Sequence, residues 1–76
     1  MAISNDWAPG DQFCLLDYGT IDTLFRSQLL AMGMTIGVVI RVVRIAPLKS
    51  PIQIEVRGVM MALRREDLLA LHWKKL

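Results

Sequence analysis

The side chains that most often perform chemistry are scarce in this chain. His72 is the only histidine and Cys14 the only cysteine, and they lie far apart in the sequence. A Cys–His nucleophilic site also needs a third group that orients the histidine, and no such set is recognisable here. The sequence has no GxxxxGK[ST] or GxGxxG run to hold a phosphate group. We therefore expect a protein that is not an enzyme and that requires no cofactor.

His72 is nevertheless a weak candidate metal ligand. Zinc sites usually need several Cys or His side chains at close spacing, and this chain has one of each. A site could form if His72 joined carboxylates, or if two copies of His72 met across a symmetric dimer. The alternative is a surface or interface histidine beside Trp73. Weak binding of a divalent transition metal and formation of a homodimer are thus two hypotheses.

Arg64 and Arg65 form a second candidate site, because exposed guanidinium groups bind anions and can act as arginine fingers. The same pair also occurs in a solvated turn beside a helix. Charge is uneven along the chain: residues 1–25 contain four Asp and no Lys or Arg, whereas the remainder contains nine bases and three acids. This asymmetry either orients a docking partner or is cancelled by the fold.

A nucleic-acid-binding barrel is an alternative function, but two features argue against it. The net charge is only +2, and the aromatic residues do not alternate with the bases. We therefore expect no nucleic-acid partner.

The length predicts one domain, residues 1–76, in which most apolar side chains serve a single core. The longest uncharged run, residues 27–40, contains two glycines and is too short to cross a bilayer. The start of the chain has neither a basic residue nor a sustained apolar run, so it does not resemble a secretory signal. One cysteine allows no internal disulfide. We expect a cytoplasmic protein without direct membrane insertion.

Five short strands and three helical segments are predicted along the chain. Strand-forming residues and their alternation place the strands at residues 12–18, 38–45, 52–57, 59–63 and 72–76. A helix over residues 21–32, capped by Thr20, is predicted from apolar residues three and four apart: Ile21, Leu24, Phe25, Leu29 and Met32. Short helical turns are expected at residues 4–6 and 64–71. So many short strands favour a small, partly open barrel, because closure removes exposed edges.

The strand at residues 38–45 should be irregular. Arg41 and Arg44 differ in parity and would point to opposite faces of a flat strand, which predicts a bulge or a strong bend. Pro47 and Pro51 then enclose a rigid surface loop. Five residues are assigned roles in backbone geometry: Gly33, Gly37, Pro47, Pro51 and Gly58.

Three runs of sequence, "LLAMGMTIG", "VVRIAPLKSPIQIEVRG" and "MALRREDLLAL", resemble in order and spacing the FeoA family of ferrous iron transport accessory proteins. A "PGD" near the start also matches, and the resemblance extends over almost all of the chain from about Leu24. It departs at Lys49 and Ser50, where the family usually has Gly-Asp or a similar turn pair. The resemblance implies a mostly β fold with short helices, an SH3-like small five-stranded barrel with one longer helix inserted after the first strand.

The resemblance also implies a partner. It indicates a cytosolic protein of bacterial ferrous iron uptake that docks on the cytosolic part of FeoB, a membrane transporter with a GTP-binding domain, and promotes its activity. SH3-like barrels bind partners with loops around an apolar groove. The predicted docking surface is therefore Leu48, Lys49 and Ser50, together with the exposed part of the helix at residues 21–32.

Three alternatives stay open. Pro47 and Pro51 could merely shape a hairpin. The protein could be a metal-responsive regulatory module, or it could stimulate GTP hydrolysis through Arg64 or Arg65.

Overall fold

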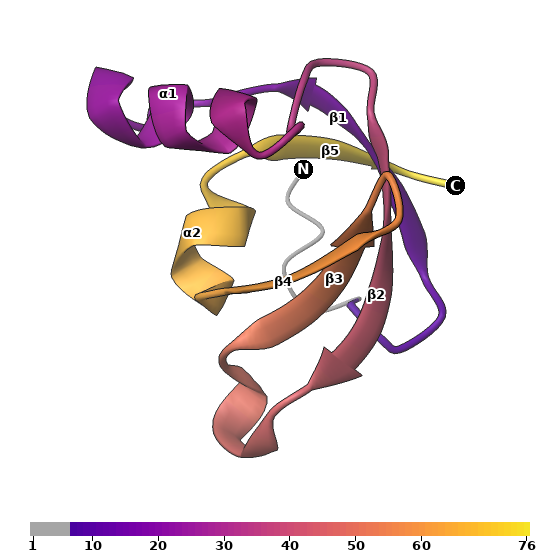
Figure 1. Ribbon diagram of the computed structural model, residues 1–76. Helices are drawn as coiled ribbons and strands as arrows, with labels where there is room; N and C mark the ends of the chain where they lie inside the picture. The colour runs from indigo at the N-terminus through magenta and orange to yellow at the C-terminus, as the bar shows by residue number, and fades with distance from the viewer. Residues whose placement is uncertain (1–6) are drawn as a thin grey trace.

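The computed structural model describes residues 7–76, so the helical turn expected at residues 4–6 lies outside the described residues. Figure 1 shows the elements in chain order. They are β1 (Gln12–Asp17), α1 (Thr23–Ala31), β2 (Val39–Ile45), η1 (Pro47–Lys49), β3 (Ile52–Val56), β4 (Val59–Leu63), α2 (Arg65–Leu69) and β5 (His72–Lys75). The predicted order of strands and helices is confirmed.

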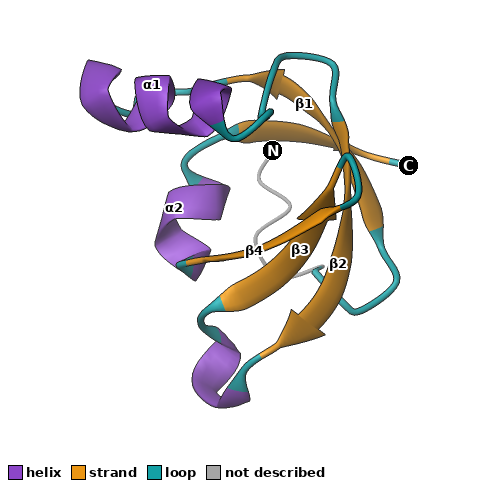
Figure 2. Cartoon of the chain, in the orientation of Figure 1, coloured by secondary structure: helices purple, strands orange, loops and turns teal. Residues whose placement is uncertain are grey.

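The strands form one antiparallel sheet in the order β4-β3-β2-β1-β5. Figure 2 shows how the strands curve, with α2 beside them. Alternate residues of β3 face the interior, and Ile52, Ile54 and Val56 are buried as predicted. Leu68 of α2 is also fully buried. The structure is thus the expected small five-stranded barrel with its longer helix after the first strand.

Two strands of this sheet contain irregular registers. The pairing of β2 with β3 shifts between Val42 and Arg44, which confirms the predicted bulge. Because of this shift Arg41 and Arg44 are both exposed although their parity differs. The pairing of β1 with β5 shifts in the same way between Leu15 and Asp17. Extra residues of this kind bend a strand and increase its twist, which lets one sheet curve around the core.

Helix α1 begins later than predicted, and the expected cap at Thr20 is wrong. The N-cap is Asp22, whose Oδ1 accepts a hydrogen bond from the backbone N–H of Phe25 at 2.7 Å. A carboxylate is the stronger cap because its charge also favours the helix N-terminus. The expected burial of Leu24 is wrong too, since its exposed fraction is 71%. Phe25 and Leu29 make the contact with the core, and Leu24 lies about 100° around the helix from Phe25.

The end of α1 has the predicted glycine turn. Gly33 has φ +89°, which favours glycine, and its N–H donates to the carbonyl of Leu30 at 3.1 Å. The N–H of Met34 donates to the carbonyl of Leu29 at 2.9 Å, and both side chains are fully buried. This pair of bonds with its apolar contact is the Schellman motif. Gly37 and Gly58 also stand in turns with positive φ.

Aromatic side chains close the core near the start of the described chain. The rings of Trp7 and Phe13 stack with their centroids 4.1 Å apart, and Trp73 meets Trp7 edge-on at 5.6 Å. The indole Nε1 of Trp73 donates to the carbonyl of Leu68 at 2.8 Å, which satisfies its polar atom.

No helix in the described part of the chain has the length and hydropathy that crossing a bilayer requires.

Gly19 is the point at which the β1–α1 connection touches the α2–β5 junction. A Cβ at Gly19 would lie 2.0 Å from the carbonyl oxygen of Ala70, and Gly19 has φ +62°. Gly10 has a similar positive φ of +93°, but a Cβ there would meet nothing within 4 Å. The two glycines therefore separate the effect of a steric clash from that of backbone conformation.

We expect Gly19→Ala to lower the free energy of unfolding by about 3 kcal/mol, because a backbone carbonyl must move. Gly10→Ala should cost only about 1 kcal/mol, the penalty for a positive φ alone. Urea denaturation of both variants measures the difference. Equal losses would show that the approach to Ala70 is not a tight constraint.

Candidate docking surface

The loop between β2 and β3 contains two backbone hydrogen bonds of its own. The N–H of Ala46 donates to the carbonyl of Pro51 at 3.1 Å, and the N–H of Lys49 donates to the carbonyl of Ala46 at 2.9 Å. The residues between these bonds form η1, and the Ser50–Pro51 peptide bond is cis. These two backbone hydrogen bonds add to the restriction that the two prolines place on the backbone of the loop.

Leu48 stands at the tip of this loop in an unusual conformation. It has φ +68° and ψ +14°, and Lys49 has φ +70°. In the turn closed by the Lys49–Ala46 bond, Leu48 occupies the third position, where a positive φ normally calls for Gly or Asn. Its exposed fraction is 97%, so no packing contact within the described chain compensates for this conformation. The fold therefore holds an apolar side chain out into solvent.

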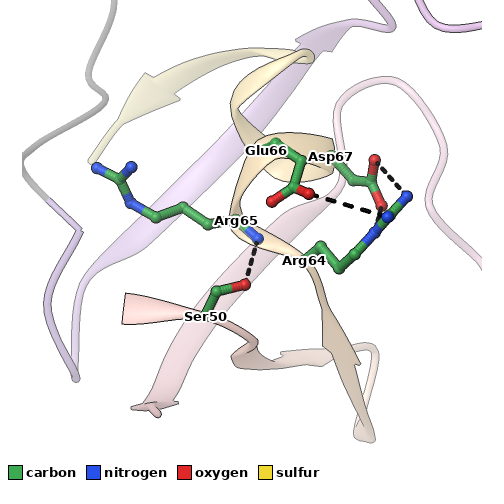
Figure 3. A network of polar contacts seen from close by, with 5 residues as sticks. All are labelled: Ser50, Arg64, Arg65, Glu66 and Asp67. Carbon is green, nitrogen blue, oxygen red and sulfur yellow. Dashed lines mark hydrogen bonds and ion pairs between the residues drawn. The ribbon is translucent and has the colours of Figure 1, made fainter. Parts of the chain in front are cut away.

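Ser50 joins this loop to helix α2. Its Oγ accepts a hydrogen bond from the backbone N–H of Arg65 at 3.1 Å, as Figure 3 shows. Arg65 is the first residue of α2, and N–H groups in the first turn of a helix have no partner within the helix. The N-cap residue Arg64 makes no side-chain cap. Ser50 thus caps α2 from another part of the chain and places both arginines next to the Leu48 loop.

The two arginines extend in opposite directions from the start of α2 (Figure 3). The Nε of Arg64 lies 3.0 Å from Oδ2 of Asp67, and its Nη1 lies 3.8 Å from Oε2 of Glu66. The hydrogen bond that Arg64 donates to Asp67, and then the charges of Asp67 and Glu66, raise the pKa of Arg64. An arginine finger has to leave such partners before it reaches a nucleotide. The geometry therefore favours a role for Arg64 at the start of α2 over a role as an arginine finger.

The fold cancels part of the charge asymmetry and leaves the rest. Strand β5, which carries Lys74 and Lys75, pairs with the acidic β1 segment, and Nζ of Lys75 lies 3.5 Å from Oδ2 of Asp11. The segment from β2 to α2, residues 39–69, has six bases against three acids. The Leu48 loop and both arginines of α2 belong to this segment. The fold therefore cancels the asymmetry in part, and orientation of a docking partner by the remaining charge stays a prediction.

The family follows from comparison with known proteins. The FeoA domain matches residues 5–71. This chain belongs to the FeoA family. Its fold is similar to the solution NMR structure of the FeoA protein from Chlorobium tepidum, with a TM-score of 0.86, 25% identity, and coverage of 100% of this chain and 70% of that one.

Two further structures are similar to this FeoA-family protein. One is a crystal structure of an iron uptake regulatory protein, FeoA, with a TM-score of 0.79, 28% identity, and coverage of 100% of this chain and 96% of that one. The other is a solution NMR structure of a protein from Pseudomonas aeruginosa, with a TM-score of 0.71, 42% identity, and coverage of 90% and 92%. The SH3-like fold and the family resemblance seen in the sequence are confirmed.

The structure does not bring together every residue of the predicted docking surface. In Figure 1, α1 lies at the top and the loop that contains η1 lies at the bottom. The exposed part of α1 and the Leu48 loop therefore do not form one surface in this FeoA-family protein. Sequence reasoning missed that Ser50 contacts Arg65, because the two are distant in the chain. The pairing of Arg64 with Asp67, three residues later on a predicted helix, was detectable from spacing.

His72 lies beside one carboxylate. Its Nδ1 is 2.8 Å from Oδ1 of Asp17, and both side chains are more than half exposed. Within residues 7–76 no group of three or more His, Cys, Asp or Glu side chains is placed to hold a metal ion. Weak metal binding at His72 stays a prediction.

Leu48→Gly tests whether the Leu48 conformation is strained. We expect Leu48→Gly to be more stable than Leu48→Ala by about 1 kcal/mol, because both remove the side chain but only glycine accepts a positive φ without cost. Urea denaturation of the two variants gives the difference. If alanine and glycine are equally stable, the turn imposes no penalty on Leu48.

Asp17→Asn tests the contribution of the Asp17 carboxylate, which contacts both the N–H of Gly19 and His72. The N–H of Gly19, which donates at 2.8 Å, and then His72 lower the pKa of Asp17. A carboxyl group with a lowered pKa stabilises the fold above its ordinary pKa, and this contribution disappears as the pH falls through the folded-state pKa. Asp17→Asn should therefore be less stable than wild type at neutral pH and equally stable in strong acid. Urea denaturation across this range checks it, and a pH-independent difference would contradict it.

Proposed function

We propose that this FeoA-family protein acts in ferrous iron uptake by docking on the cytosolic part of a FeoB-type transporter and promoting its activity, without catalysing a reaction itself. Family membership supports the link to iron uptake. The observation that carries the docking proposal is Leu48, which is 97% exposed and held at positive φ. Backbone strain of this kind concentrates at binding and switch sites.

Leu48 has the properties of an anchor residue. Moving a leucine side chain from water into an apolar pocket contributes about 2 kcal/mol. The two backbone bonds of the loop fix the position of Leu48 before binding, so little conformational entropy is lost on association. Lys49 follows it with a positive charge, which would orient the loop toward an acidic surface of the partner and raise the association rate.

Two other functions fit the described residues less well. Binding of single-stranded nucleic acid relies on aromatic rings that stack on bases, but Trp7, Phe13, Tyr18 and Trp73 are buried here. Stimulation of GTP hydrolysis through Arg64 would require breaking its contacts with Asp67 and Glu66. We therefore rank docking above both functions, and we place the protein in the cytosol with the nucleotide-binding part of the transporter.

Leu48→Asp should weaken binding to purified FeoB in detergent or nanodiscs by about tenfold or more, because a charge would enter an apolar pocket. Lys49→Glu should mainly slow association and remove its dependence on salt. Surface-based binding kinetics, with and without a GTP analogue, measure both effects.

Leu24→Asp is the matched control, because Leu24 is also an exposed leucine, with 71% exposure, but lies on α1 away from the loop. It should leave the affinity unchanged. If wild type and Leu48→Asp bind equally well, or if only Leu24→Asp weakens binding, the loop is not the docking surface.

A further inference from the structure

The free edge of β4 has backbone groups that are available for pairing. β4 is an outer strand of the sheet and pairs only with β3. The two strands are joined by a two-residue turn, Arg57-Gly58, in which both residues have positive φ. In such a hairpin Val56 and Val59 form a hydrogen-bonded pair, so alternation directs the N–H and C=O groups of Met60 and Ala62 away from β3. No hydrogen bond of the described chain uses these four groups.

The two outer strands of the sheet differ in how they are protected. β5 carries His72, Lys74 and Lys75, and charged residues, Lys above all, are a common protection of sheet edges. β4, with the sequence VMMAL, has no charge and no proline. Val59 is 57% exposed and Met60 is 46% exposed. An apolar edge without charges is a template for a further strand.

A second copy of this chain is a poor match for the charge of Arg57 at the start of β4, because β4 itself contains no acidic residue. Two β4 strands paired antiparallel about a two-fold axis near Met61 would bring Arg57 of one copy opposite Arg64 or Arg65 of the other. Arg57 is exposed, and its side chain donates to the carbonyl of Gly33 at 3.3 Å and to Oγ1 of Thr35 at 3.1 Å, which are neutral acceptors. Its charge is therefore available to attract an acidic residue and to repel a basic one.

We propose that β4 binds an extended segment of the docking partner by strand addition, and that this segment is apolar in its middle and acidic at the end that meets Arg57. Met60 and Ala62 supply the backbone bonds, and Arg57, whose acceptors are neutral, supplies the charge complementarity. The edge is continuous with the Leu48 loop, because Leu63 pairs with Ile52 and Ser50 binds the N–H of Arg65. This inference rests on the proposed function only in that the same partner would contact the loop and the edge.

The test uses wild-type protein labelled with ¹⁵N and a synthetic peptide, acetyl-Glu-Val-Thr-Val-Thr-Val-Glu-amide. We expect amide hydrogen exchange at Met60 and Ala62 to slow by about tenfold when the peptide saturates the edge. Exchange at Met61, whose N–H already bonds to β3, should change little. The same peptide with Lys in place of both Glu should bind more weakly, and one in which every valine and threonine is N-methylated should give no protection.

Three outcomes would overturn the proposal. One is the absence of protection at Met60 and Ala62 with the Glu peptide. Another is equal binding of the Lys peptide, which would remove the charge argument. The third is protection that appears without peptide as the protein concentration rises, which would make a second copy the occupant. Because the transporter is absent from this experiment, failure here leaves the Leu48 docking test unaffected, and failure of that test leaves this result standing.

Discussion

The whole structure depends on one sheet enclosing the core almost by itself. All five strands belong to one sheet, so they have to bend until their inner faces meet. The register shifts in β2 and β1 provide this bend, because each inserts a residue that is not paired in the ladder. The curved sheet does not close on itself. It begins at β4 and ends at β5, so each of these strands has one side that pairs with no other strand. The two edges differ: β5 is protected by charged residues, whereas β4 has none.

The contacts of helix α2 show how core packing determines where surface residues lie. Its five residues are too few for an isolated helix to form in water. It is held by contacts from three directions: Trp73 donates to the carbonyl of Leu68, Ser50 caps the N–H of Arg65, and Gly19 lies against Ala70. The Leu48 loop is attached to the same helix through Ser50. Core packing therefore determines where Leu48 and the arginines stand relative to each other.

The features that the sequence could predict are those with a local cause. Alternation in β3, the parity conflict between Arg41 and Arg44, and the glycine after α1 each act within a few residues, and each appears in the structure. The cap of α1 was missed, because Thr20 and Asp22 are both good caps and the choice between them depends on how the preceding turn packs. The exposure of Leu24 was missed, because a spacing rule gives the width of a helix face only approximately.

The candidate site was harder to predict, because its geometry is made by contacts between distant segments. The residues of the loop were identifiable from the two prolines, but the positive φ of Leu48 and the bond from Arg65 to Ser50 have no local signature. The residues that form the core of this protein differ from those that are exposed at the candidate docking surface. Leu48 is 97% exposed, Val59 57% and Met60 46%, whereas Ile52, Ile54 and Val56 of the neighbouring strand β3 are buried. Substitutions at the exposed positions should therefore change association much more than folding, and this separation is what a docking module requires.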